Sequence, residues 1–175
     1  MDKEVFLDAF MEAIRAIINR RYFSTERGYQ AELYSQLRCR LKDIAQLEAG
    51  AIVEAEYQKS FTLHKLRIRP DLIVHVPREV RSDKDPSKDN FCVIEMKRKA
   101  SKNDAEKDFS KLDQLFDTLN YKLGIFLNID SANTFFDCYT GNYEERLHCF
   151  AVRLVKNKMV LKEEVNKWDL KAERM

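Results

Sequence analysis

Two short apolar segments of the chain each carry an acidic side chain at a point where a buried β-strand does not ordinarily tolerate one. Asp71 opens the segment 71–76, and Glu95 lies within the segment 91–97. Side chains alternate between the two faces of a strand, so Glu95 and Lys97 share one face of the second segment. If the two strands pair, Asp71 and Glu95 can approach each other. The sequence therefore predicts two neighbouring carboxylates with a lysine beside them.

This arrangement favours metal-dependent chemistry. Two carboxylates at the end of hydrophobic strands repel each other and lose hydration, and a divalent cation is the usual way to make such a pair favourable. Mg²⁺, for which Mn²⁺ can substitute, suits carboxylate oxygens and keeps positions open for a phosphate oxygen and an attacking water. The chemistry indicated is phosphodiester hydrolysis. Lys97 would stabilise the transition-state charge or act on the water as a general base, and the sequence leaves both roles open.

Pro70-Asp71 followed by Glu95-Met96-Lys97 resembles the two halves of the motif of the PD-(D/E)XK nuclease superfamily. The resemblance covers roughly residues 28–130. It implies a restriction-endonuclease-like α/β fold of three layers, with a central mixed β-sheet flanked by α-helices. It also implies a Mg²⁺-dependent endonuclease that acts on DNA in restriction, repair or recombination.

The same resemblance adds residues from the helices on either side of the motif. In the family an acidic residue on the helix before the sheet often joins the catalytic and metal-binding set, and the matching residue here is Glu32. Gln36, one turn later, and Gln114, on the helix after the motif, are supporting candidates. A solvated place on the flank of the helix would explain Glu32 equally well.

Basic residues directly follow the second half of the motif. Arg98, Lys99 and Lys102 could form a positive rim that holds a nucleic-acid backbone through its phosphates, although a solvated corner between strand and helix would look the same. The whole chain has 31 basic and 29 acidic residues, so it is not a polycation and any nucleic-acid surface must be local.

Hydrophobic periodicity predicts the elements that position these residues. The expected helices cover residues 3–22, about 29–47, 103–121 and 163–173. The expected strands cover residues 51–57, 63–76, 91–97, 123–129, 133–139, 147–155 and 159–161. The helix between the strands 91–97 and 123–129 forms a crossover, which predicts that these two strands are parallel. A charged, polar connection is expected over residues 77–90.

Length and composition indicate one globular domain over residues 1–175. Hydrophobic residues make up 45% of the chain, and the 4 Gly and 3 Pro are too few for general disorder. The 4 cysteines lack paired C-x-x-C spacing, and neither a signal peptide nor a membrane span is recognisable, so a reducing cytoplasm is expected. Duplex cleavage often needs two sites, which makes a homodimer plausible.

Two other classes of protein could produce the same pattern. One is a catalytically inactive module that keeps the nuclease fold and binds nucleic acid or a protein partner. The other is an unrelated α/β domain in which Glu95 and Lys97 form an ordinary ion pair on one strand face. Metal binding separates these readings, because only the enzyme needs the cation.

Overall fold

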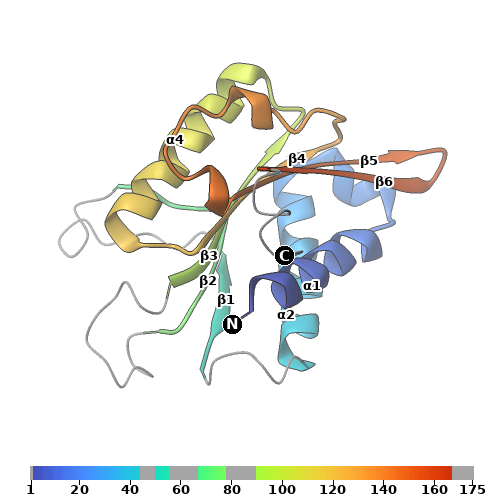
Figure 1. Ribbon diagram of the computed structural model, residues 1–175. Helices are drawn as coiled ribbons and strands as arrows, with labels where there is room; N and C mark the ends of the chain where they lie inside the picture. The colour runs from blue at the N-terminus through green and yellow to red at the C-terminus, as the bar shows by residue number, and fades with distance from the viewer. Residues whose placement is uncertain (1, 44–49, 56–66, 78–89, 167–175) are drawn as a thin grey trace, which may run out of the picture.

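The computed structural model describes residues 2–43, 50–55, 67–77 and 90–166. There the chain forms an α/β fold in which helices flank a six-stranded mixed sheet (Figure 1). The helices are α1 (Lys3–Ala16), α2 (Glu26–Asp43) and α4 (Lys102–Leu119), with the short 3-10 helices η1 (Arg20–Ser24), η3 (Phe136–Cys138) and η4 (Glu144–Arg146). The strands are β1 (Ile52–Ala55), β2 (Leu72–His75), β3 (Asn90–Arg98), β4 (Leu123–Ile129), β5 (Leu147–Val155) and β6 (Lys158–Val165).

The strands lie in the sheet in the order of the sequence, from β1 to β6. β2 is antiparallel to both β1 and β3, whereas β3, β4 and β5 are parallel and β6 returns antiparallel to β5. The parallel pairing of β3 with β4 through α4 confirms the expected crossover. The register of β2 with β3 shifts between Val74 and His75. Phe91, which strict alternation places on the face of Glu95, instead packs edge to face against Phe6 of α1.

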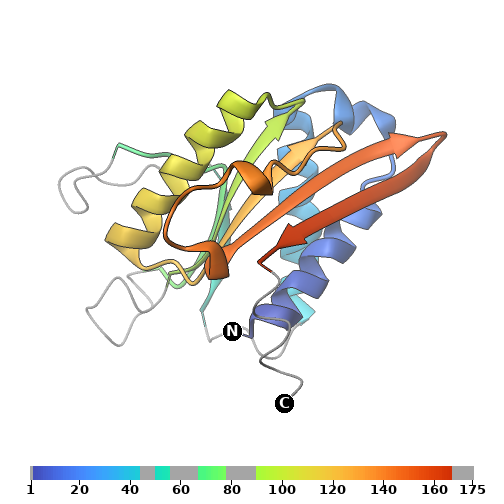
Figure 2. The same ribbon diagram turned by 45° about the horizontal axis from the view of Figure 1, so that its top comes forward.

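Helices cover both faces of the sheet, which gives three layers (Figure 2). α1 and α2 lie on one face and α4 on the other. Alternate strand residues supply the two cores, as a period of two requires. The core under α1 and α2 includes Phe6, Phe10, Leu33, Leu72, Ile94 and Ile125. The core under α4 includes Ile73, Val93, Phe109, Leu112, Phe116 and Phe126.

Local signals set the ends of α4, the helix that faces the acidic strand positions. Ser101 caps its first turn, and Asp104 bonds back to the Ser101 backbone N–H in a reciprocal capping box. The helix ends at Leu119, and the left-handed backbone of the cap residue Asn120 closes its last turn. The next strand lies close beneath, because a Cβ on Gly124 would come 2.4 Å from the Phe116 ring. These features fix α4 against the middle of the sheet.

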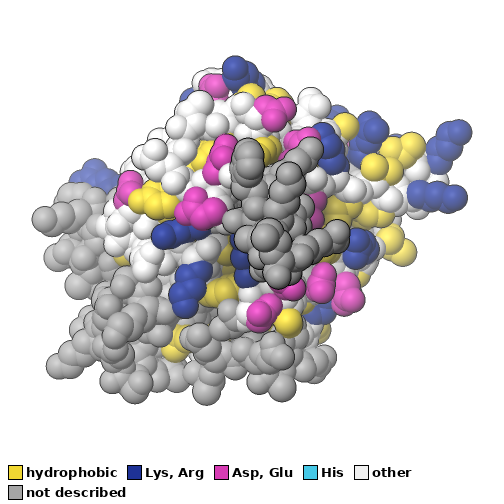
Figure 3. Space-filling view, viewed as in Figure 1, with side chains coloured by type: hydrophobic (Ala, Val, Ile, Leu, Met, Phe, Trp, Pro, Cys, Tyr) yellow, Lys and Arg dark blue, Asp and Glu magenta, His cyan; other side chains and the backbone are white. Residues whose placement is uncertain are grey.

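Charged side chains of both signs are interspersed over the face of the molecule in Figure 3, in keeping with the nearly even charge balance. None of the helices within the described ranges is long and apolar enough to span a membrane.

The strands expected at 123–129 and 147–155 are confirmed, whereas the strand expected at 133–139 is wrong. Phe135 takes a left-handed backbone conformation, with φ 58°, and η3 follows it. Thr134 is buried and donates its hydroxyl hydrogen to Glu164 of β6. The aromatic residues here pack onto the core beneath α4 as a loop, so their apolar character reflects packing and not a strand.

Other element boundaries also differ from those that the sequence predicts. The first helix stops at Ala16 and not at residue 22, because Asn19 caps the separate turn η1 and α2 then begins at Glu26. The edge strand β6 extends to Val165, so a terminal helix does not start at residue 163. The parts of the predicted elements at 44–47, 56–57, 63–66 and 167–173, and most of the connection 77–90, lie outside the described residues.

Candidate active site

The two acidic residues of the motif are brought together by the paired strands β2 and β3. Asp71 directly precedes β2, and Leu72 pairs with Ile94, so the antiparallel register brings Asp71 beside Glu95 on β3. The Asp71 carboxylate accepts a 2.6 Å hydrogen bond from the Met96 backbone N–H. The Gln30 side chain of α2 donates to the Asp71 backbone carbonyl at 2.8 Å. Asp71 is therefore held from both the sheet and the helix layer.

Burial makes this acid pair electrostatically costly. Glu95 is only 2% exposed, and its Oε1 has no hydrogen-bond partner among the residues that the structure describes. Burial, followed by the charge of Asp71, raises the pKa of Glu95 to about 8. Burial also raises the pKa of Asp71 to about 6, although the Met96 N–H and Lys97 oppose the shift. A nearby positive charge would therefore stabilise the ionised form of both carboxyls.

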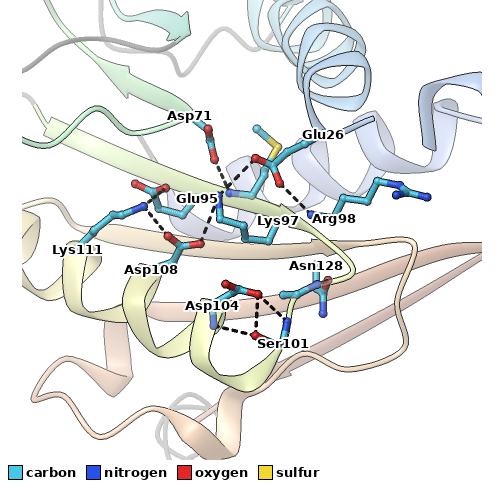
Figure 4. A network of polar contacts seen from close by, with 12 residues as sticks. Glu26, Asp71, Glu95, Lys97, Arg98, Ser101, Asp104, Asp108, Lys111 and Asn128 are labelled. Atoms are coloured by element: carbon cyan, nitrogen blue, oxygen red, sulfur yellow. Dashed lines mark hydrogen bonds and ion pairs between the residues drawn. The ribbon is translucent and has the colours of Figure 1, made fainter. Parts of the chain in front are cut away.

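Two lysines and a further buried carboxylate complete the cluster in Figure 4. Lys111 of α4 lies 3.6 Å from Glu95 Oε2 and 2.6 Å from Asp108 Oδ1. Lys97 Nζ lies 4.0 Å from Asp108 Oδ2. Asp108 is 1% exposed, so this buried carboxylate links both ammonium groups to the acid pair.

The environment of Lys97 bears on its protonation. Burial alone would lower the pKa of Lys97. The carboxylates of Asp108 and Glu26 raise it by more than burial lowers it, so the pKa of Lys97 lies above its usual 10.5. Lys97 is therefore an ammonium at neutral pH in the metal-free protein. This favours an electrostatic role for Lys97 over that of a general base.

An acidic residue of α2 does contact this cluster, and it is Glu26. Its Oε1 lies 3.4 Å from Lys97 Nζ, and its Oε2 accepts from the Arg98 backbone N–H at 3.0 Å. Glu32, the residue expected from the resemblance, lies half-buried along the same helix and accepts from Gln36 at 2.8 Å. Of these two glutamates of α2, Glu26 contacts Lys97, whereas the contact of Glu32 with Gln36 lies within the helix.

The two predicted glutamines make contacts within their own helices. Gln36 bonds to Glu32 and accepts from Arg40 at 2.7 Å. Gln114 is exposed and donates to the Ser110 carbonyl of its own helix at 3.1 Å. Neither contact joins these glutamines to the acid pair.

Sequence reasoning missed Glu26, Asp108 and Lys111. Asp108 had a detectable signal, because it lies three residues after Ala105 and four before Leu112 on the buried stripe of α4. A carboxylate on the apolar face of an amphipathic helix is unusual, and a buried acid needs a partner. Glu26 had no such signal, since its role depends on how α2 packs against the end of β3.

The basic rim expected after the motif is engaged in ion pairs. Arg98 lies 3.1 Å from Asp130 and donates from Nε to the Phe23 carbonyl at 2.6 Å. Lys99 shares the same carboxylate at 3.2 Å, and Lys102 pairs with Glu106 at 3.6 Å. Arg98 thus ties η1 to the ends of β3 and β4, and carboxylates offset much of the rim's positive field.

The acid pair fits a hard divalent cation of the Mg²⁺ type. Asp71 and Glu95 offer carboxylate oxygens, and Glu95 Oε1, which lacks a hydrogen-bond partner in the described part of the chain, is a buried acceptor that a cation would satisfy. Within the described ranges no three His, Cys, Asp or Glu side chains gather as a complete metal cage. Mg²⁺ does not require one, because it is commonly held by one or two carboxylates together with waters and substrate phosphate.

Comparison with known proteins adds no relative: no family model, no curated protein and no solved structure matches the chain.

Proposed function

We propose that this protein is a Mg²⁺-dependent nuclease of the PD-(D/E)XK type that hydrolyses phosphodiester bonds of DNA. The observation that carries the proposal is the acid pair formed by buried Glu95 on β3 and partly buried Asp71, which directly precedes the adjacent strand β2, with Lys97 on the same strand as Glu95. The three-layer arrangement of helices around a mixed sheet supports the restriction-endonuclease-like fold that the motif implies.

In this mechanism Asp71 and Glu95 would hold the cation through their carboxylates. The Met96 N–H fixes the orientation of the Asp71 carboxylate. When bound, Mg²⁺ supplies positive charge to a phosphate oxygen and lowers the pKa of an attacking water. The Lys97 ammonium stabilises negative charge that develops on the phosphate. Asp108 positions Lys97 and Lys111 so that both positive charges stay beside the acid pair.

Plasmid cleavage tests this function. Supercoiled, linear and branched DNA would be incubated with Mg²⁺, Mn²⁺ or EDTA, using the wild type and an identically purified Asp71→Asn variant. The proposal expects metal-dependent cutting that the substitution abolishes. Cutting that persists in Asp71→Asn would point to a contaminating nuclease or a different site. Folded wild type that cuts none of these substrates would remove the enzymatic proposal.

A second candidate is the inactive nuclease-fold module. It is favoured by the ion pairs of the site, because Lys111 already lies beside Glu95 and Lys97 beside Glu26. Internal ammonium groups could compensate the acids permanently and leave no role for a metal. DNA binding that is unaffected by Mg²⁺, together with no cutting on any substrate, is the result this candidate expects.

A further inference from the structure

The turn end of the hairpin of β5 and β6 is basic. Residues 147–162 contain four Lys and Arg side chains and no Asp or Glu, and Glu163 and Glu164 follow near the far end of β6. The four are Arg153, Lys156, Lys158 and Lys162. Lys162 pairs with Glu164 at 2.8 Å. For Arg153, Lys156 and Lys158 no carboxylate in the described part of the chain serves as a partner, and all three are exposed.

The turn of the hairpin presents these charges outward. Lys156 and Asn157 both have positive φ, 50° and 62°, as in a tight two-residue turn between antiparallel strands. Val155 and Val160 beside the turn are 41% and 42% exposed. The hairpin extends beyond the helices, and basic side chains gather at its end (Figures 2 and 3).

Sheet register relates the hairpin to the candidate active site. Lys97 pairs with Asn128, Asn128 with Ala151, and Ala151 with Lys162, so one row of the sheet joins β3 to β6. Arg153 lies two residues after Ala151 in β5, and Lys158 lies four residues before Lys162 in β6, so both are nearer the turn. Because each is an even number of residues away, Arg153 and Lys158 lie on the same face of the sheet as Ala151 and Lys162. Three strand spacings span about 14 Å, and four residues along a strand span about 13 Å. Lys158 therefore lies roughly 19 Å from Lys97.

That separation suits a nucleic-acid backbone. Phosphates of one strand follow each other at about 3.4 Å along the duplex axis, so ~19 Å corresponds to five or six nucleotides. The cations next to the site are paired with Asp130 and Glu106, and they offer little free charge to substrate. Arg153, Lys156 and Lys158, which have no carboxylate partner among the described residues, are placed to supply it.

We infer that the β5–β6 hairpin is a phosphate-binding arm that contacts the DNA backbone several nucleotides from the bond to be cut. The inference rests on the proposed nuclease function for its substrate. The arm contacts phosphates without reading bases, so it contributes affinity and salt dependence and not sequence preference. Its contacts also set the direction in which the strand leaves the acid pair.

The test compares two variants that each lose three positive charges. The hairpin variant is R153Q/K156Q/K158Q, and the control is R15Q/R38Q/K42Q, whose residues are exposed on α1 and α2. Affinity for a fluorescent DNA duplex would be measured by anisotropy in EDTA over a range of salt. Circular dichroism and melting temperature establish that both variants fold.

The hairpin variant should reduce the slope of log affinity against log salt by up to ~2.7, at about 0.9 per lost phosphate contact. Its loss of affinity should then be about 40-fold larger at 50 mM than at 200 mM salt. The control should keep the wild-type slope. Plasmid cutting by the hairpin variant should weaken at low DNA concentration and recover at saturation.

Several outcomes would overturn the inference. An unchanged slope in the hairpin variant, an equal loss in the control, or a wild type that does not bind DNA would each do so. Self-association of the hairpin variant with intact DNA affinity would show that the lysines instead protect the edge strand β6. If the wild type binds DNA through the hairpin but never cuts it, the phosphate-binding arm would be supported and only the nuclease function would be excluded.

Discussion

The buried glutamate of the site should destabilise the metal-free protein at alkaline pH. Glu95 is almost fully enclosed, and within the described ranges one of its carboxylate oxygens has no hydrogen-bond partner. Replacing it by glutamine keeps the shape of the side chain and removes the charge. Glu95→Gln should therefore make the metal-free protein more stable at high pH, which is the reverse of what most substitutions at a buried position do.

The sign follows from the two pKa values. Burial and the charge of Asp71 raise the Glu95 pKa from its ordinary 4.5 to about 8 in the folded protein. Between these values the folded state holds a proton that the unfolded state has released, so stability falls as pH rises. Above the folded pKa this loss of unfolding free energy no longer grows with pH. At ~1.4 kcal/mol per pH unit between the two pKa values, the largest possible loss of unfolding free energy is about 5 kcal/mol.

Structural relaxation and water entry reduce this largest possible loss. We therefore expect the unfolding free energy of the wild type to fall by roughly 2–5 kcal/mol between about pH 5 and pH 8.5 because of Glu95. In a domain of this size that corresponds to a melting temperature higher by roughly 5–15 °C for Glu95→Gln at the alkaline end. At about pH 5 the two proteins should melt close together, because Glu95 is then protonated and neutral.

Thermal and urea denaturation in EDTA across this pH range would measure the effect. Glu12→Gln is the matched control, since its carboxylate has a side-chain exposure of 67%. Adding Mg²⁺ at the alkaline end should stabilise the wild type and leave Glu95→Gln unchanged. Parallel pH profiles for the wild type and Glu95→Gln would refute the claim that Glu95 is buried at a cost, and with it the electrostatic argument for a cation.

Four further substitutions test other parts of the structure. Asp71→Asn and Lys97→Ala should each reduce plasmid cutting by roughly 100-fold or more with normal circular dichroism, because each removes site charge without core volume; native-rate cutting would exclude that residue. Asp108→Asn should lower the pKa of Lys97 toward its usual range, which NMR titration of the lysine ε-carbon would detect as an earlier midpoint. Gly124→Ala should cost about 1–3 kcal/mol in urea denaturation through its clash with Phe116, and a companion Phe116→Leu change should restore part of that loss.

The sequence by itself located the central strands and the faces of the acidic residues. The strands 123–129 and 147–155 were predicted with the bounds they have, and the segment 91–97 lies within β3. These predictions worked because the alternation of side chains along a strand is local and depends only on adjacent residues. The same alternation placed Glu95 and Lys97 together on one face.

The tertiary structure decided which other residues surround the acid pair. Glu26 and Asp108 reach Lys97 from helices on opposite faces of the sheet, and their sequence distances from it reveal nothing about that contact. Asp130, at the end of β4, pairs with Arg98 and Lys99 of the predicted basic rim. Long side chains find their partners through the packing of whole layers, so their ion pairs depend on angles and distances between elements. Local periodicity predicts the elements themselves but carries no information on that packing.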